Sequence, residues 1–390
     1  MNKNFVFLFF FFCLSKSFQA QIQLSVYSEV SIITAGPGSQ LYEAFGHSAI
    51  RIKDPVLNLD LIYNYGVFDF NTPNFNLNFA KGNLIYSLSR YDFKYFLGNY
   101  KKDNRWLKQQ VLNISQQERQ EFFIYLENNA QLENKNYSYD PYFNNCASIL
   151  RDITQTILNN KIDFGVNPTQ KNQTFRQLTN NELHWNAWGT FGLNLIAGIK
   201  LDQEATLEEE MYLPDYVYNT FKEAKLFVKN EPQDLIKKER LLLDFPEKKQ
   251  ASTVFSPFLI FSIIAIIGIF ITLIDHKNNK RSKYIDFSLF FITGIIGVVL
   301  LFLWFFSSHS TAPNNFNVLW AFAPNLVVAF ILLKENLPKW IKTYTQVLLG
   351  FLLIAMGIWI FKIQVLPLVI LPLFVLFIIR YLFLSRQVIK

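Results

Sequence analysis

Two residues that can act together as nucleophile and base lie far apart in the sequence. Cys146 lies in "YFNNCASILRD" and His47 in "AFGHSAIRI". The apolar residues after Asn144 follow helical spacing, and Asn144 is a good N-cap, which predicts Cys146 in the first turn of a helix. Backbone N–H groups and the helix dipole stabilise a thiolate there. His47 opens a segment rich in β-branched residues, so we expect it on a strand. Such a pair can carry out nucleophilic catalysis.

The N-terminus has the features of a secretory signal peptide. Residues 1–20 contain Lys3, an apolar run from Phe5 to Leu14, and a small residue at Ala20. The run is short for a membrane span, so we expect a cleaved signal, with an uncleaved anchor as the alternative. After cleavage Cys146 is the only cysteine of an exported protein, and exported proteins usually pair their cysteines or do without them.

From Thr253 onward the chain has the composition of a membrane protein, and the whole chain is 51% hydrophobic. We predict a membrane domain over 253–390. Five apolar stretches in it are long enough, or nearly so, to cross a bilayer as helices. They cover about 254–274, 286–306, 316–334, 343–361 and 364–384.

Charge in the loops predicts the orientation of these spans. The basic residues gather in two loops and the tail, as Lys277, Lys280, Arg281, Lys283, Lys334, Lys339, Lys342, Arg380, Arg386 and Lys390, whereas residues 307–317 contain no Lys or Arg. Because positive loops face the cytoplasm, we expect residues 21–232 in the periplasm of a bacterium, a charged linker over 233–252, and a cytoplasmic C-terminus at the inner membrane. The net charge of +7 then belongs largely to these loops, and nucleic-acid binding is not expected.

The exported part combines strand and helix patterns. Strands are expected at 31–36, 47–54 and 59–70 and from about residue 84, and a helix at 115–133 opens with Ser115 and Glu118 as a capping box. If the strands 47–54 and 59–70 pair around the Asp54–Pro55 turn, Asn64 or Tyr65 falls near His47. Asn64 ranks first as the group that orients His47, and a turn-side polar residue is the alternative interpretation.

Each member of the pair also has a simpler explanation. A lone cysteine is most often a small core residue, and a lone strand histidine is usually structural. Export argues against an idle thiol, because it is liable to oxidation outside the cell. Spacing alone leaves both interpretations open.

The segments around His47 and Cys146 resemble the exported domain of the Lnb family of bacterial proteins, which has an NlpC/P60-like, permuted papain fold. The histidine strand precedes the cysteine helix in that order, as here. Further matching stretches are "YNYGVFDF", "GNLIYSLSRYDF", "TFRQL", "WGTFGLNLIAG", "YLPDYV" and, in the membrane half, "SSHSTAPNNFNVLWAFAPNL". The resemblance implies an α+β domain with an antiparallel sheet, followed by an all-α bundle of five transmembrane helices.

The resemblance also implies lipoprotein N-acylation. An acyl chain would move from a phospholipid, through a Cys146 thioester, to the α-amino group of a diacylglyceryl-cysteine lipoprotein. His47 would act as the base, and N–H groups at the start of the helix would hold the oxyanion. No cofactor is implied, and the widely separated histidines argue against a metal site.

Further residues are candidates for substrate binding. His309, Asn315 and Asn317 lie in the outer loop, where they are expected to hold a lipid headgroup or, alternatively, to cap helix ends. Tyr65 is a further candidate. Two rival functions remain at this point: an NlpC/P60-like cysteine peptidase or amidase acting on cell-wall peptides, and a non-enzymatic membrane protein that binds a partner.

Overall fold

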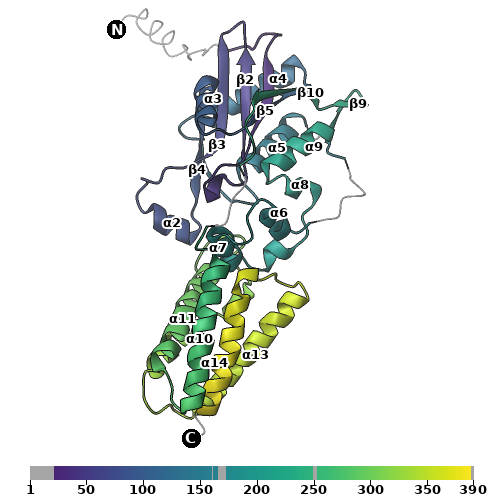
Figure 1. The fold of residues 1–390 in the computed structure, drawn as a ribbon. Coiled ribbons are helices and arrows are strands. Elements are labelled where there is room, and N and C mark those ends of the chain that lie inside the picture. Colours follow the sequence, from purple (N-terminus) through teal and green to yellow (C-terminus); the bar gives the residue numbers. More distant parts are fainter. Residues whose placement is uncertain (1–21, 160, 166–172, 249–252, 388–390) are drawn as a thin grey trace, which may run out of the picture.

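The computed structural model describes residues 22–159, 161–165, 173–248 and 253–387, so the predicted signal peptide lies outside the described residues. An α+β domain stands on one end of a helical bundle (Figure 1). The C-terminal end of the described chain lies at the opposite end of the bundle. The predicted fold class is therefore confirmed, apart from the number of membrane helices.

A seven-stranded antiparallel sheet forms the centre of the α+β domain, in the spatial order β10-β5-β1-β2-β3-β4-β6. Its strands are β1 (Glu29–Ala35), β2 (His47–Asp54), β3 (Leu59–Val67), β4 (Ile85–Asp92), β5 (Leu107–Leu112), β6 (Asn136–Ser138) and β10 (Ile236–Leu243). A smaller sheet joins β7 (Ile162–Asp163), β8 (Lys225–Val228) and β9 (Glu231–Asp234). The predicted hairpin of the second and third strands is present, with Ile50 opposite Tyr63.

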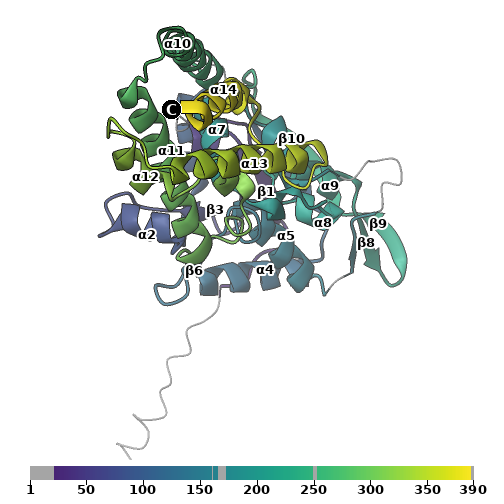
Figure 2. The same cartoon turned by 90° about the horizontal axis from the view of Figure 1, so that it is seen from below.

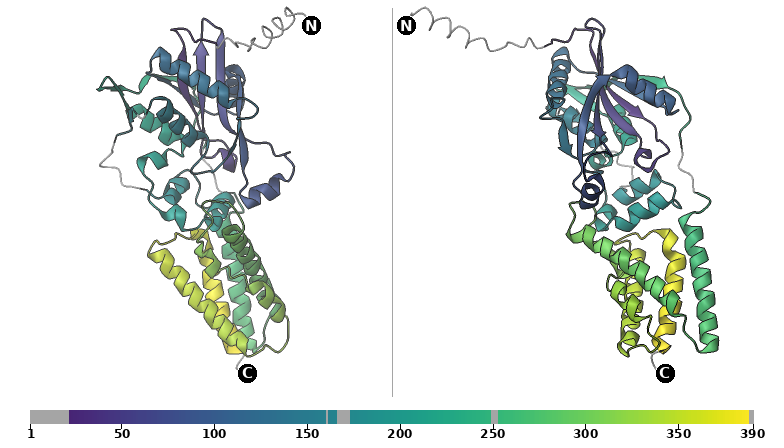
Figure 3. Two further views of the ribbon diagram at one scale, coloured as in Figure 1. Left: turned by 180° about the vertical axis from the view of Figure 1, so that it is seen from behind. Right: turned by 90° about the vertical axis from the view of Figure 1, so that its left-hand side faces the viewer.

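Helices cover both faces of the main sheet (Figure 3). One face packs on α3 (Phe93–Lys102) through Phe93 and Phe96. The other face carries the main core, built with α4 (Gln116–Asn129), α5 (Cys146–Ile157) and α9 (Pro214–Glu223). The capping box predicted at Ser115 and Glu118 is confirmed at the start of α4.

Shorter helices connect the sheet to the membrane bundle. They are η1 (Leu41–Glu43), α2 (Phe75–Lys81), α6 (Phe175–Asn181), α7 (Trp188–Ile196), η2 (Ile199–Asp202) and α8 (Leu207–Glu210). Figure 1 shows α7 on top of the bundle and α2 beside it.

The prediction of a charged linker over 233–252 was wrong for residues 236–243. Residues 236–243 form the edge strand β10, which pairs with β5, where Glu239 lies opposite Gln110. Lysine and glutamate on the outer side of an edge strand discourage pairing with other chains, and the same charges disguised the strand in the sequence.

Four described helices are long and apolar enough to cross a membrane, one fewer than the five continuous helices predicted. They are α10 (Pro257–Asn278), α11 (Lys283–Phe305), α13 (Trp340–Ile360) and the segment Leu368–Gln387, which comprises η4 (Leu368–Ile370) and α14 (Leu371–Gln387). Figure 2 views this bundle along its length.

The third predicted span is a broken segment rather than a long helix. It consists of η3 (Phe316–Leu319) and the seven-residue α12 (Asn325–Ile331), which packs against α11. Pro324 directly precedes α12 and lacks the N–H that a continuous helix would use. A Cβ on Gly297 would lie 2.1 Å from the Ala321 carbonyl oxygen, so the glycine permits this close approach of the irregular backbone.

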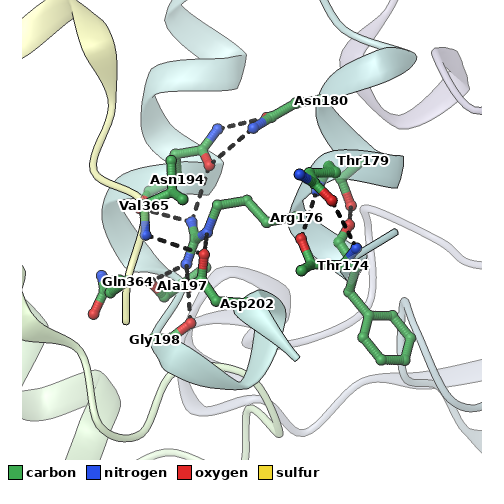
Figure 4. A network of polar contacts seen from close by, with 12 residues as sticks. Thr174, Arg176, Thr179, Asn180, Asn194, Ala197, Gly198, Asp202, Gln364 and Val365 are labelled. Carbon is green, nitrogen blue, oxygen red and sulfur yellow. Dashed lines mark hydrogen bonds and ion pairs between the residues drawn. The ribbon is translucent and has the colours of Figure 1, made fainter. Parts of the chain in front are cut away.

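A buried polar network ties the α+β domain to the bundle (Figure 4). Arg176 on α6 forms a bidentate ion pair with Asp202, whose Oδ1 also accepts from the Val365 N–H at 3.0 Å. Nδ2 of Asn315 donates to the Leu195 carbonyl at 2.8 Å. Both side chains of the ion pair are almost fully buried, so the two parts of the molecule share a solvent-excluded joint.

Candidate active site

Cys146 is the first residue of α5, and the N-cap is Asn145. The Asn145 Oδ1 accepts hydrogen bonds of 2.9 Å from the N–H groups of the second and third helical residues. The sequence predicted Asn144 as the cap. That side chain instead donates to the Ser138 carbonyl at 2.6 Å, and its backbone pairs with Asp140. Helical spacing could not choose between two adjacent asparagines.

The Asn145 cap is itself held by the surrounding loops. Its Nδ2 donates to the carbonyl oxygens of Pro141 at 2.7 Å and of Tyr212 at 2.8 Å. The side chain is therefore fully used, with its oxygen serving the helix and its nitrogen serving the loops. This cap fixes where α5 begins and so where the Cys146 thiol lies.

His47 begins β2 after a backbone turn that requires glycine. Gly46 has a φ of +74°, and a Cβ at this position would lie 2.7 Å from the Ala35 carbonyl oxygen. The His47 ring is half-buried, with its centroid 6.4 Å from that of Phe96. The turn therefore brings the imidazole to the end of the sheet nearest α5.

Asn64 lies beside His47, with its Oδ1 2.5 Å from His47 Nε2. The Asn64 Nδ2 donates to the Tyr91 hydroxyl at 3.3 Å. This hydrogen bond places the amide nitrogen toward Tyr91 and the amide oxygen toward His47. Because an amide oxygen only accepts, Nε2 must carry the proton. The other ring nitrogen, Nδ1, is left as the base for Cys146. The orienting role of Asn64 stays a prediction.

Gly66 allows β3 to bend between the histidine and the cysteine. The register shifts between Asn64 and Val67, and Gly66 has a φ of +89°. A Cβ at this position would lie 3.5 Å from the Cys146 Cβ and 4.0 Å from the His47 Cε1. The glycine in "YNYGVF" is the signal that could have indicated this bulge, since glycine inside a strand pattern marks a bulge or a close approach.

The electrostatics of the pair favour a thiolate and an imidazolium. Burial alone would raise the pKa of Cys146, but the His47 charge and hydrogen bond and the N–H groups of Ser48 and Cys146 outweigh it and lower this pKa. Burial alone would lower the pKa of His47, but the Cys146 charge and the hydrogen bonds to Cys146 and Asn64 raise it, against the repulsion of Arg105. This ion pair is the reactive form of a cysteine nucleophile.

Tyr137 is a residue of the site that the sequence did not reveal. Burial and the nearby Cys146 charge raise the pKa of its hydroxyl. The Gly66 N–H lies close enough to favour the phenolate slightly, but no hydrogen bond to the buried hydroxyl oxygen forms among the described residues. A buried hydroxyl without a partner beside a nucleophile can donate to a bound oxyanion. Its strand, β6, is only three residues long and carries no clear pattern.

Tyr65 does not face His47. It is 4% exposed, packs in the main core, and its hydroxyl accepts from the Asn129 Nδ2 at 2.9 Å. Successive residues of a strand point to opposite faces of the sheet, so the Tyr65 side chain points away from that of Asn64. The candidate role of Tyr65 in substrate binding stays a prediction.

The polar residues of the outer loop contact the α+β domain and the ends of short helices. Asn315 and Asn317 are buried in the joint, where both Nδ2 groups donate to the Leu195 carbonyl, and Asn315 caps η3. The alternative of helix capping applies to Asn315, and the predicted contact of these residues with a lipid headgroup stays a prediction. His309 instead contacts α2, with its Nε2 2.9 Å from the Phe79 carbonyl oxygen.

Among the described residues, no three His, Cys, Asp or Glu side chains gather in a way that could hold a metal ion. The groups that meet around Cys146 are its thiol, the His47 imidazole, the Asn64 amide and nearby N–H and O–H donors.

Comparison with known proteins identifies both halves of the chain. Residues 15–181 match the family model described as the Lnb N-terminal periplasmic domain, and residues 248–390 match the Lnb transmembrane domain. No curated protein and no solved structure matched the chain. The matches make this a lipoprotein-processing membrane protein with a periplasmic N-terminal domain, which fits the inner membrane.

Proposed function

The chain belongs to the Lnb family, and from this premise and the geometry of the site we propose that it is a lipoprotein N-acyltransferase with a Cys146–His47 pair. The observation that carries the proposal is the closeness of the two side chains: the Cys146 Cβ and the His47 Cε1 lie 3.5 and 4.0 Å from the same Cβ position on Gly66, and the Asn64 Oδ1 lies 2.5 Å from the His47 Nε2. A thiolate of this kind forms thioesters, and a joined membrane bundle suits a reaction whose donor and acceptor both reside in a bilayer.

The first half-reaction forms an S-acyl enzyme. The Cys146 thiolate attacks the ester carbonyl carbon of a phospholipid, and the negative charge moves to the carbonyl oxygen. The Cys146 N–H and the Tyr137 O–H are the donors we assign to this oxyanion. The intermediate collapses with cleavage of the C–O bond, and the His47 imidazolium gives its proton to the departing lysophospholipid oxygen.

The second half-reaction transfers the acyl chain to nitrogen. The free α-amino group of a diacylglyceryl-cysteine lipoprotein attacks the thioester carbon, and His47 accepts the proton that the amine loses. The C–S bond breaks and the thiolate is restored beside the imidazolium. Water in place of the amine would give hydrolysis, which is the outcome expected of a peptidase or an amidase.

The direction of the spans is also part of the proposal. The ends of α10 and α11 away from the periplasmic domain meet, where Arg281 donates to the Leu332 carbonyl and Lys283 pairs with Glu335. The basic loops therefore gather at the end of the bundle that also carries the described C-terminal end. The positive-inside rule supports a cytoplasmic location for this end.

The test uses the full-length protein in phospholipid vesicles without an acceptor. We expect intact mass to show one added acyl chain on Cys146 that neutral hydroxylamine removes, and no addition on Cys146→Ala. Adding a synthetic diacylglyceryl-cysteine peptide should transfer the chain to its amine, whereas the same peptide with an acetylated amine should leave the thioester intact. Persistent absence of the adduct, or its loss to water alone, would overturn the proposal.

A further inference from the structure

A continuous row of aromatic rings runs between Cys146 and the membrane bundle. We name it the aromatic ladder, and its members in spatial order are Tyr139, Tyr86, Phe68, Phe70, Phe75 and Phe79. Successive ring centroids lie 4.0, 5.0, 4.8, 5.1 and 6.2 Å apart. Four of the six rings come from the segment 68–82, which joins β3 to β4 and contains α2.

One end of the aromatic ladder lies at the nucleophile. The Tyr139 ring stacks on Tyr86 with an interplanar angle of 17°. Tyr86 lies opposite Tyr137 in the sheet, and the Tyr137 hydroxyl oxygen and the Cys146 Cβ lie 4.0 and 3.5 Å from the same position, that of a Cβ built on Gly66. A hydrocarbon chain that lies along these rings would therefore end next to the Cys146 sulfur.

The other end lies at the membrane boundary. The Ser308 N–H donates to the Lys81 carbonyl at 2.7 Å, and the His309 Nε2 donates to the Phe79 carbonyl at 2.9 Å. Gly82 has a φ of +75°, and a Cβ there would lie 2.6 Å from the His309 nitrogen. These contacts hold the C-terminal end of α2 against the loop that follows α11.

The segment 68–82 exposes apolar side chains at this boundary. Phe70 is 62% exposed, Leu77 51% and Phe79 50%. Phe305 and Phe306, which immediately precede the loop held by α2, are 64% and 74% exposed. Aromatic residues at the end of a membrane helix mark the interface between lipid and water. The exposed apolar side chains of α2 therefore lie next to those at the end of α11 nearest the α+β domain.

We propose that the segment 68–82 lies in the outer leaflet and guides one acyl chain of a phospholipid along the aromatic ladder to Cys146. This inference rests on the proposed function. An acyl chain is the occupant that suits these contacts, because the stacked rings themselves present an apolar surface and the segment carries only Asp69 and Lys81 as charged residues. His309 is in this account a positioning residue that holds α2.

The experiment compares two acyl donors for the full-length protein in vesicles of bacterial phospholipid. The triple variant Phe70→Ser, Leu77→Ser and Phe79→Ser should form the Cys146 thioester from phospholipid at least about tenfold more slowly, because apolar contact with the chain is lost. A water-soluble short-chain p-nitrophenyl ester should acylate it at the rate of the parent protein, because this donor needs no membrane route. The matched control is Val56→Ser, Leu132→Ser and Phe227→Ser, three exposed apolar residues elsewhere in the periplasmic domain.

A photo-reactive phospholipid gives a second readout. With a diazirine in the acyl chain, we expect labelled peptides from 68–82, and the triple variant should lose this label. The inference is overturned if the triple variant keeps the phospholipid rate, if labelling is confined to the bundle, or if the variant changes only the oligomeric state. If neither donor acylates Cys146 in the parent protein, it is the proposed function that fails.

Discussion

At the scale of single residues, the reactivity of Cys146 depends on a balance between burial and its polar neighbours. Burial opposes the thiolate, while His47 and the backbone N–H groups favour it, and the second influence is larger. Burial opposes the charge on His47, but the Cys146 charge and the hydrogen bonds to Cys146 and Asn64 outweigh it and raise the pKa of His47. The contributions of His47 and Asn64 can be tested separately, because each comes from one side chain.

Replacing His47 tests the first of these influences. The alkylation rate of Cys146 by iodoacetamide follows the thiolate, so it falls as pH decreases through the thiol pKa. In the parent protein we expect the midpoint, the pH at which the alkylation rate is half-maximal, to lie below the value for an ordinary cysteine. In His47→Ala the burial remains without the compensating charge, so the midpoint should move to higher pH. An unchanged midpoint would mean that the two side chains do not form an ion pair.

Replacing Asn64 tests how the imidazole is held. The reaction needs imidazolium to protonate the leaving oxygen, so its rate is lost as pH rises through the His47 pKa. Removing the hydrogen bond in Asn64→Ala lowers this pKa. The alkaline limb of the pH–rate profile for thioester formation should therefore move to lower pH. Asn64→Asp places a carboxylate there and should move the limb to higher pH. If neither variant moves the limb, Asn64 does not orient His47.

Replacing Tyr137 tests the oxyanion donor. In Tyr137→Phe we expect thioester formation to slow by about 10²-fold, within the range for loss of one oxyanion donor. The alkylation rate of Cys146 should stay unchanged, because the hydroxyl acts on the oxyanion and not on the thiolate. Thermal stability should not fall, since this hydroxyl has no hydrogen-bond partner among the described residues. Parallel loss of alkylation and stability would indicate a structural role instead.

At the scale of elements, the start of α5 is the part that aims the nucleophile. Asn145→Ala removes two bonds to the helix and two to the loops, so it should destabilise the domain by more than the about 1 kcal/mol of an ordinary cap. The matched control is Ser115→Ala at the exposed cap of α4. Thermal unfolding of the purified protein measures both, and equal losses would contradict the account.

The elements also show what the sequence alone could predict. Alternation and turn chemistry were sufficient for the β2–β3 hairpin and therefore for the neighbourhood of Asn64 and His47. The extended pattern of β10 was hidden by the charges that suit an edge strand. The hydropathy of the third predicted span is continuous, but its helix is interrupted at Pro324 and where its backbone approaches Gly297. Tyr137 could not be predicted, because its place depends on tertiary packing around a three-residue strand.

At the scale of the whole molecule, the joint fixes the α+β domain on one end of the helical bundle. Arg176 and Asp202 are 2% and 4% exposed at their side chains, and Asp202 also holds the loop before η4. A buried pair of this kind contributes to specificity of arrangement more than to net stability, but breaking it leaves a buried charge uncompensated.

Breaking this pair should affect stability and lipid access together. Arg176→Ala should cost about 3–5 kcal/mol, whereas Arg90→Ala, which breaks an exposed pair with Glu127, should cost about 0–1 kcal/mol. Where Arg176→Ala still folds, thioester formation from phospholipid should fall more than that from a soluble ester. The conservative variant Arg176→Lys should recover part of the loss. Equal losses with both donors would show that the joint only stabilises the fold.

The central claim is that Cys146 supplies an acyl chain to lipoproteins in the cell. The most direct measurement is the intact mass of the N-terminal lipopeptides of lipoproteins from cells with the protein, without it, and with Cys146→Ala in its place. The account predicts that these lipopeptides lose one acyl chain in the last two strains. Lipopeptides that keep every acyl chain in all three strains would contradict it.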